Sequence, residues 1–250
     1  SHYPCQILPR NTVWKEPENT EPFYLIPDYE TDEDGEKIAK TFGHLPFLSG
    51  GSGLLKPLAE YLISGSDTSR QIPKTAVPGK ALLIAGSCSK MTLSQIAWYQ
   101  AQNMPSLRMD PFALLNGAQT SEQIWQFIET HTDDTHAVLV YSSDTPEMVR
   151  RSQELGREKI ASMLEQLCAD LAKKAVEHGF TRIISAGGET SGAITKGLHF
   201  SSYEIGESIA PGVPVMVPAL RPDIRLVLKS GNFGQEDFFG RALSMTGQNP

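Results

Sequence analysis

The most constraining feature of this sequence is the uninterrupted apolar run Ala81-Leu82-Leu83-Ile84-Ala85, in which no polar residue marks a solvent-facing side. A strand without alternation is buried on both faces, which is typical of a parallel sheet covered by helices. Further apolar-rich runs occupy residues 23–26, 137–141, 181–185, 213–217 and 224–228. Helical patterns separate several of these runs, so the sequence predicts an α/β fold with a mostly parallel sheet flanked by helices on both faces.

The strongest helical pattern spans Glu158–His178, where apolar residues recur at intervals of three and four, and Gly179 is expected to end it. Thr31-Asp32-Glu33-Asp34 is a helix-start signal. Weaker helical patterns cover residues 54–63, 92–102, 121–129 and 236–244.

The domain organisation is read from the prolines and from the loops. Residues 1–22 contain four prolines and are interpreted as an arm or linker of unknown role. Residues 64–79 are predicted to form a long loop, because they are rich in small and polar residues. Residues 23–250 are expected to form one domain.

Charge and cysteine content exclude several function classes. The net charge of −7 argues against nucleic acid or an anionic membrane as the main partner. No apolar window is long enough to span a bilayer, and no secretory signal is recognisable. The three cysteines are far apart and form no CxxC pair, which favours a reducing, cytoplasmic environment.

Four loops that follow apolar runs consist of glycine and hydroxyl residues. They are Ser49–Gly53, Gly86–Ser89, Gly187–Gly192 and Lys229–Gly234. Glycine lets the backbone approach a ligand closely, and free N–H groups at a helix start bind phosphate oxygens. Each loop alone could be only a tight turn, but several at one predicted sheet edge indicate a nucleotide or polyphosphate site.

Familiar alternatives to this site lack their motifs. The sequence contains no GxxxxGK[ST], no GxGxxG in the dinucleotide-binding position and no GxSxG. The histidines show no metal-binding spacing, so no metal-ligand set is predicted. Cys88 has no base beside it in sequence, and a small thiol packed between strand and helix is the favoured interpretation.

The ordered motifs resemble those of the four-carbon acid sugar kinases, from about Phe23 to Leu243. The resemblance rests on Gly187-Gly188-Glu189-Thr190-Ser191-Gly192, on Tyr203–Glu207, on Ile209–Pro214 and on Leu228–Gly234, with support from Gly86–Ser89 and Gly50–Leu54. It implies that this chain carries the nucleotide-binding C-terminal domain of an ATP- and Mg²⁺-dependent kinase. The substrate implied is a four-carbon sugar acid of the threonate, erythronate or 3-oxo-tetronate type.

Together with the loop chemistry, the resemblance assigns ATP to a defined set of positions. The candidate nucleotide-binding residues are Gly86, Ser87, Ser89, Gly187, Gly188, Glu189, Thr190, Ser191, Lys229, Gly231 and Asn232. Lys229 is preferred over Lys90 as a phosphate partner, with a solvated strand-end lysine as its alternative. Glu189 could hold Mg²⁺ through water or cap a helix, and Glu204 and Glu207 are weaker candidates for Mg²⁺.

The resemblance also limits what the chain is expected to do alone. Family members have an N-terminal domain that holds most of the sugar-acid site, and its Asp-Asp-Phe-Thr-Gly-like loop does not occur here. The catalytic residue therefore stays unknown, and the chain alone is expected to be inactive. Two alternatives are a non-catalytic nucleotide-binding module that needs a partner chain, and another α/β enzyme with a nucleotide cofactor. A homodimer also stays open.

Overall fold

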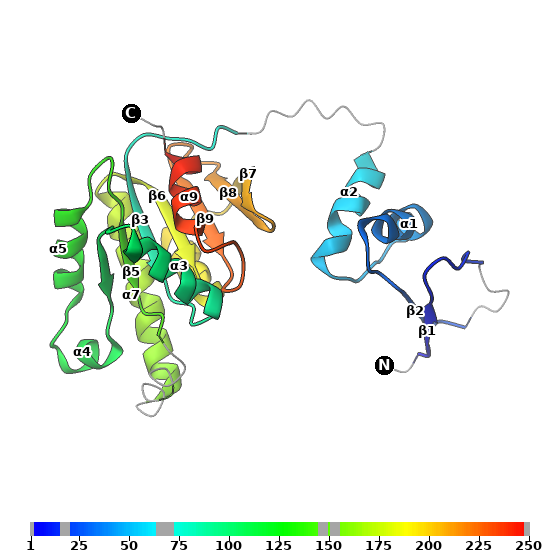
Figure 1. The fold of residues 1–250 in the computed structure, drawn as a ribbon, viewed down its shortest axis with the longest axis horizontal. Coiled ribbons are helices and arrows are strands. Elements are labelled where there is room, and N and C mark those ends of the chain that lie inside the picture. Colours follow the sequence, from blue (N-terminus) through cyan, green and yellow to red (C-terminus); the bar gives the residue numbers. More distant parts are fainter. Residues whose placement is uncertain (1–2, 16–20, 64–72, 145–149, 151–155, 248–250) are drawn as a thin grey trace. The chain divides into compact units, whose positions relative to one another are not determined.

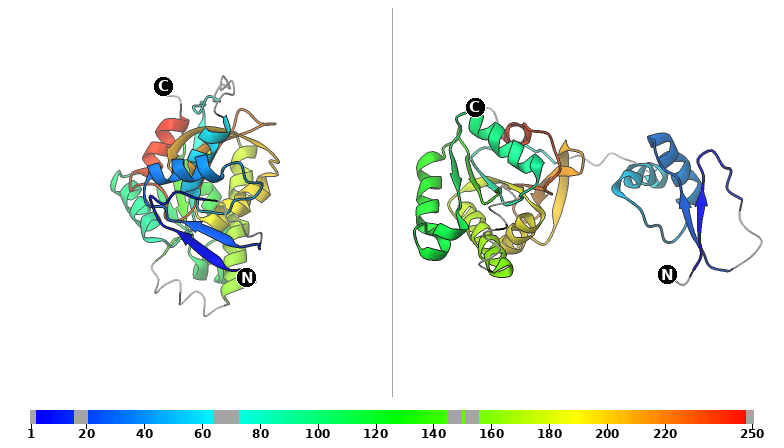
Figure 2. Two further views of the ribbon diagram at one scale, coloured as in Figure 1. Left: turned by 90° about the vertical axis from the view of Figure 1, so that its right-hand side faces the viewer. Right: turned by 60° about the horizontal axis from the view of Figure 1, so that its bottom comes forward.

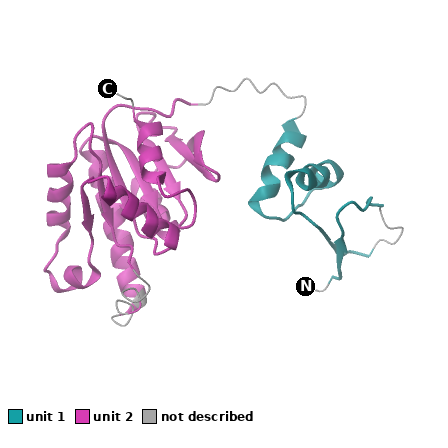
Figure 3. Ribbon diagram, viewed as in Figure 1, with its two compact units in different colours: residues 1–71 teal, residues 72–250 magenta. Residues whose placement is uncertain are grey.

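The computed structural model describes residues 3–15, 21–63, 73–144, 150 and 156–247, and divides the chain into two compact units (Figure 3). Unit 1 is Ser1–Gln71 and unit 2 is Ile72–Pro250. This division differs from the expected boundary after residue 22. Most of the predicted loop 64–79 lies outside the described residues, and the division falls within it.

Unit 1 contains two short strands and two α-helices. Its elements are β1 (Cys5–Leu8), β2 (Tyr24–Pro27), α1 (Asp32–Phe42), the 3₁₀ helix η1 (Ser52–Leu54) and α2 (Leu55–Ile63). Strand β1 pairs with β2 in parallel, so the segment expected to be an arm contributes half of a two-stranded sheet. Helix α1 begins at the predicted start signal, where Thr31 forms a capping box with Asp34.

The most buried polar side chain of unit 1 is Asp34, which is only 5% exposed. Burial opposes its ionisation, but hydrogen bonds from Thr31, from the backbone of Glu30 and from Arg10 outweigh burial and lower its pKa to about 2. The Arg10 Nε lies 3.0 Å from the carboxylate. A charged pair on α1 therefore connects the N-terminal segment to the rest of unit 1.

Unit 2 is built around one seven-stranded sheet in the order β4-β5-β3-β6-β9-β8-β7 (Figure 1). The strands are β3 (Lys80–Ala85), β4 (Ser106–Arg108), β5 (Val138–Tyr141), β6 (Phe180–Ala186), β7 (Tyr203–Ala210), β8 (Val213–Pro218) and β9 (Arg225–Lys229). The first five in the spatial order pair in parallel, whereas β8 is antiparallel to both β9 and β7. The mostly parallel sheet is confirmed.

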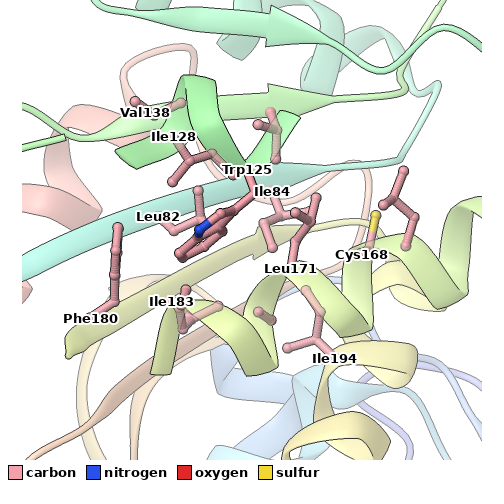
Figure 4. Packing of buried hydrophobic residues seen from close by; sticks show 14 of the residues in the cluster. Leu82, Ile84, Trp125, Ile128, Val138, Cys168, Leu171, Phe180, Ile183 and Ile194 are labelled. Atoms are coloured by element: carbon pink, nitrogen blue, oxygen red, sulfur yellow. The ribbon is translucent and has the colours of Figure 1, made fainter. Parts of the chain in front are cut away.

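Helices cover both faces of this sheet (Figure 2). The helices of unit 2 are α3 (Lys90–Ala101), α4 (Pro111–Asn116), α5 (Ser121–His131), α7 (Arg157–Glu177), α8 (Gly188–Leu198) and α9 (Phe238–Thr246). Alternate residues of each central strand face opposite sides, so Leu82 and Ile84 pack with α5, α7 and α8 (Figure 4). Leu83 and Ala85 pack with α3 and α9.

The predicted elements and the observed ones agree closely in the interior and less well at the sheet edges. The long predicted helix is α7, and Gly179 follows it with a φ of +83°, the left-handed conformation that ends helices. Strands β4 and β7 and helix α4 were not predicted. Within the described residues, no helix has the length and apolar character needed to cross a membrane.

Residues 73–79, called the strap here, lead into β3 and are held by the amino-terminal end of the sheet. Arg225 donates to the carbonyl oxygens of Lys74 and Thr75 at 2.6 and 3.0 Å, and Arg182 donates to that of Gly79 at 2.7 Å. Both arginines are buried. The strap is thus fixed at the end of the sheet where the parallel strands begin, opposite to their carboxyl ends.

Candidate functional site

Three of the four glycine- and hydroxyl-rich loops follow neighbouring strands. Gly86–Ser89 follows β3, Gly187–Gly192 follows β6, and Ser230–Gly234 follows β9, and these strands are adjacent and parallel (Figure 1). From β3 the chain continues to the β4 side of the sheet, and from β6 it continues to the β7 side. Ligands of open α/β sheets bind at such a switch in direction.

The fourth loop is not part of this arrangement. Residues 45–48 do not form a strand, and Ser49–Gly53 belongs to unit 1, where it leads into η1 and α2. The interpretation of Ser49–Gly53 as a loop that follows a strand of the sheet is therefore wrong. Pro46 removes a backbone N–H from a run of only four residues, which disfavours a strand there.

Backbone hydrogen bonds join the three remaining loops to one another. The N–H groups of Gly86 and Ser87 donate to the carbonyl oxygen of Ala186 at 2.9 and 3.2 Å. The N–H of Gly187 donates to the carbonyl oxygen of Lys229 at 2.7 Å. The loops therefore continue the register of the sheet beyond its strands and form one surface.

Three of the loop glycines are required by the packing of the loops themselves. A Cβ at Gly86 would collide with the Thr190 hydroxyl, and one at Gly231 would collide with the Ser87 hydroxyl. Gly187 has a φ of +137°, and its Cβ would lie 3.0 Å from the Ser87 nitrogen. We find that these positions bring the loops together, whereas the sequence suggested that Gly187 clears space for a ligand.

Gly188 is different, because no atom lies within 4 Å of where its Cβ would stand. It is exposed and is the first residue of α8, whose N-cap Gly187 provides no side-chain cap. The first N–H groups of a helix have no partner within it. The start of α8 therefore presents unpaired donors, and the positive end of the helix dipole, to open space.

The hydroxyl residues at the helix starts serve mainly to fix the loops. Ser89 caps α3 by accepting from the Thr92 N–H at 3.2 Å and donates to the carbonyl oxygen of Gly231 at 2.7 Å. The Ser191 hydroxyl lies 2.7 Å from that of Ser185 on β6. Thr190 and Ser191 are both buried, whereas Ser87 is partly exposed. Ser89 is partly exposed as well, and its N–H donates to the Ser87 hydroxyl oxygen at 3.2 Å, whereas the proton of the Ser87 hydroxyl has no described acceptor.

Lys229 is not the solvated strand-end lysine that was the alternative to a phosphate partner. Its side chain is fully buried, and burial lowers its pKa to about 8. Nζ donates to the carbonyl oxygens of Ser230 and Gly231 at 3.2 and 2.8 Å and to the Thr92 hydroxyl at 3.1 Å. The solvated alternative is wrong, and the ammonium group contacts protein oxygens rather than open space. Lys90 is exposed, as its solvated interpretation required.

The acidic candidates lie in different places. Glu189 and Asn232 are exposed in two of the three loops. Glu189 also lines a cavity of about 630 Å³ between α7 and α8, with Lys196 among the other lining residues. Glu204 and Glu207 are on β7, which β8 separates from β9, so the structure does not bring them to the three loops. Within the ranges given above, no three His, Cys, Asp or Glu residues cluster as a metal site.

Sequence reasoning missed two contributors to this edge. Thr92 is fully buried and donates to the Gly231 carbonyl oxygen at 3.0 Å. The loop after β5 begins with Ser142, whose N–H donates to the carbonyl oxygen of Ala85 at 2.9 Å, and continues to Asp144, which pairs with Arg108. The rule that chemistry follows the strands would have found the residues after β5, because that strand was predicted.

Comparisons with known proteins show which sequences and folds this chain resembles. The family model of a nucleotide-binding C-terminal domain matches residues 82–239. A 3-oxo-tetronate kinase of Actinobacillus succinogenes is 36% identical over 223 residues, which is 89% of this chain and 53% of the relative. One from Methylobacterium radiotolerans is 39% identical over 226 residues, covering 88% and 53%.

A solved structure is similar to this chain in its fold. A Haemophilus influenzae protein matches with a TM-score of 0.73 and 33% identity, covering 89% of this chain and 53% of that one. The chain thus spans about half the length of the relatives that it matches.

Proposed function

Since this chain belongs to the four-carbon acid sugar kinase family through its nucleotide-binding C-terminal domain, we propose that unit 2 binds ATP at the three joined loops. The observation that carries the proposal is the open start of α8 beside loops that meet at the switch in sheet direction. A phosphate chain there would accept hydrogen bonds from backbone N–H groups and would lie at the positive end of α8.

The candidate residues divide into two roles under this proposal. Gly188 leaves room for the phosphates, and Ser87 offers a hydroxyl from the neighbouring loop. Gly86, Gly187, Ser89, Thr190, Ser191 and Gly231 hold the loops together. Asn232 stays a prediction, because it is exposed and its side chain has no described contact with the other loops.

Mg²⁺ is proposed to arrive with the nucleotide. Phosphoryl transfer depends on neutralising phosphate charge, and Mg²⁺ supplies that neutralisation when it is bound. It usually keeps several waters and takes only one or two protein carboxylates. The residues fit this mode, because Glu189 presents one exposed carboxylate at the start of α8 and no larger cluster is described.

We propose that the phosphate acceptor is a four-carbon sugar acid, as the names of the relatives suggest, and that phosphorylation uses the nucleotide held here. We further propose that the sugar acid is bound mainly by polypeptide corresponding to the half of the relatives that this chain does not match. The 250 residues alone are then expected to bind ATP without phosphorylating threonate or 3-oxo-tetronate.

The proposal is tested by calorimetry with Mg-ATP on the intact chain and on two glycine variants. Gly188→Val should abolish binding, because a branched side chain would occupy the space in front of α8. Gly192→Val is the matched control, since Gly192 is also exposed on α8 and has no atom within 4 Å of its Cβ position. It should bind normally, and both variants should melt cooperatively.

Equal binding by wild type and Gly188→Val would show that the nucleotide binds elsewhere. No stabilisation by ATP or ADP, with stabilisation by NAD or S-adenosylmethionine, would favour another class of α/β enzyme. A ligand at a hundred times its dissociation constant adds about 2.7 kcal/mol to the free energy of unfolding, which thermal melting detects readily.

A further inference from the structure

The fully buried ammonium group of Lys229 is the most unusual charge in unit 2. It lies at the carboxyl end of β9 beneath the loop of residues 230–234, and the Phe238 ring covers it with its centroid 5.7 Å from Nζ. Its three hydrogen bonds to Thr92, Ser230 and Gly231 use all three ammonium protons. None of these acceptors carries a formal charge.

No described carboxylate offsets this positive charge. The ionisable residues on the elements and loops packed around Lys229 are Cys88, Lys90, Tyr99, Arg182, Glu189, Lys196, Arg225, Glu236, Asp237 and Arg241. Among the described contacts none of them pairs with Nζ, and the lowering of the Lys229 pKa to about 8 has loss of hydration as its cause. Buried charges are ordinarily paired, so an ammonium group held only by neutral oxygens requires an explanation.

The contacts of Lys229 show what its charge holds in place. The Gly231 carbonyl oxygen accepts from Lys229 Nζ, from the Ser89 hydroxyl and from the Thr92 hydroxyl. The Lys229 carbonyl oxygen accepts from the Gly187 N–H at 2.7 Å. Lys229 therefore contacts two of the three loops directly and reaches the first turn of α3, which follows the third loop, through Thr92. It turns the Gly231 carbonyl dipole toward the protein interior.

We propose that Lys229 is a positioning residue for the phosphate chain, which it does not touch: it fixes the Gly231 loop, and the bound phosphates are the counter-charge that the protein itself lacks. The inference rests on the proposed ATP site. A carbonyl oxygen facing the phosphates would repel them, and the lysine holds that oxygen away. Its positive charge also adds to that of the start of α8.

This role makes nucleotide binding dependent on pH. A nearby anion favours the ammonium form, so bound phosphates raise the pKa of Lys229 above its value in the free protein. Affinity is then full below about pH 8 and falls as the pH rises through the pKa of the free protein. Near pH 8, binding takes up protons onto Lys229. The last phosphate proton of ATP dissociates near pH 6, so it does not interfere above pH 7.5.

The test measures proton uptake and affinity by calorimetry between pH 7.5 and 9.5, in buffers with different heats of ionisation. Wild type should take up a substantial fraction of one proton per ATP near pH 8 and lose affinity several-fold by pH 9.5. Lys229→Met should bind ATP about tenfold or more weakly at pH 7.5, with much less effect on AMP. It should take up no proton and show no fall with pH.

Three further variants separate positioning from simple packing. Lys229→Arg keeps a charge that does not titrate in this range, so its affinity should lie closer to wild type and should be independent of pH. Lys90→Met removes an exposed positive charge from the neighbouring loop and should keep the pH dependence. Cys88→Ser removes the exposed thiol of the loop after β3 and should keep the pH dependence too.

The outcomes distinguish failure of this inference from failure of the proposed function. If wild type does not bind ATP, the proposed site is wrong. If wild type binds ATP but Lys229→Met shows the same proton uptake and the same pH dependence, the role of Lys229 is refuted. Equal weakening of ATP and AMP in a variant that still melts cooperatively would also refute it, because such a loss reflects packing alone. Nitrogen-15 NMR of the lysine Nζ, with and without ATP, measures the expected pKa rise directly.

Discussion

Units 1 and 2 differ in how much of their apolar surface they bury. Unit 2 has two clusters of fully buried side chains, one on each face of its sheet. Most exposed large hydrophobic residues belong instead to unit 1, which contributes Tyr3, Ile7, Val13, Tyr24, Ile26, Tyr29, Leu45, Phe47, Leu55, Leu62 and Ile63. Buried apolar area is the main source of stability, so we expect unit 2 to be stabilised mainly by its own core and unit 1 to be much less stable by itself.

Unit 1 relies more than unit 2 on local polar contacts for its stability. Its strands form a sheet of only two, which is marginal in water without further packing. The capping box at Thr31 and the contacts of Asp34 with Arg10 are among its most specific interactions. Unit 2 buries much more apolar area, and its core can therefore hold a charge such as that of Lys229 without unfolding.

The largest expected effect comes from separating the two units. Residues 73–250, which keep the strap, should unfold cooperatively within a few degrees of the unit 2 transition of the full chain, whereas residues 1–71 alone should unfold at a much lower temperature. Circular dichroism and amide NMR dispersion measure both. A peptide of residues 1–71 that melts at the temperature of unit 2 would contradict the comparison.

A matched pair of phenylalanines tests the same difference at single residues. Phe239 is 0% exposed in unit 2, and Phe47 is 79% exposed in unit 1. Phe239→Ala should lower the free energy of unfolding of unit 2 by about 3–5 kcal/mol, because it leaves a cavity. Phe47→Ala should change stability by less than about 0.5 kcal/mol. Urea titration gives both values, and a loss of several kcal/mol in the free energy of unfolding for Phe47→Ala would show that Phe47 is buried in the folded protein.

The charge of Lys229 gives a pH dependence to unit 2 alone. Its pKa is about 8 in the folded protein and about 10.4 in an unfolded chain, so between these values the unfolded state binds more protons. Stability therefore rises with pH from about 8 to 10.4, by a contribution on the order of 3 kcal/mol.

Lys229→Met should lack this rise. Because all other titrating groups are shared, the difference between the stability curves of wild type and variant isolates the contribution of the lysine. Parallel curves over pH 7.5–10.5 would mean that the ammonium group is hydrated in solution.

The smallest expected effect concerns two equivalent helix caps. Thr31 caps α1 in unit 1 and Thr120 caps α5 in unit 2, each in a capping box. Either threonine replaced by alanine should cost about 1 kcal/mol. Thr31→Ala should lower only the transition seen by Trp14, and Thr120→Ala only that seen by Trp98 and Trp125.

Fluorine NMR of protein labelled with fluorotryptophan follows the three indoles separately. If one cap variant shifted the unfolding transitions of all three indoles, this would show that the units unfold together.

The central strands were predictable because burial on both faces leaves a continuous apolar run, as in β3. The loops after β3, β6 and β9 could be grouped because parallel strands place their carboxyl ends at one edge. The edge strands could not be found in this way, since β7 alternates glutamate and glycine with apolar residues and β4 has only three residues.

The order of the strands and the role of Lys229 depend on tertiary structure. The adjacency of β6 and β9, which brings Gly187 to the Lys229 carbonyl, joins residues that are far apart in sequence. A lysine at the end of a strand gives no local sign that Phe238 will cover it. Likewise, nothing in the glycines shows that Gly86 makes room for Thr190 while Gly188 faces open space.

The way the strap is anchored has a consequence for tolerance to mutation. Arg225, Arg182 and Thr181 hold it through the carbonyl oxygens of residues 74, 75, 78 and 79, which every amino acid provides. In a saturation library selected for folded protein, we expect most substitutions at residues 74, 75 and 78 to survive and most at Arg225 and Arg182 to be lost. The sequence leading into unit 2 can thus diversify freely while its attachment persists.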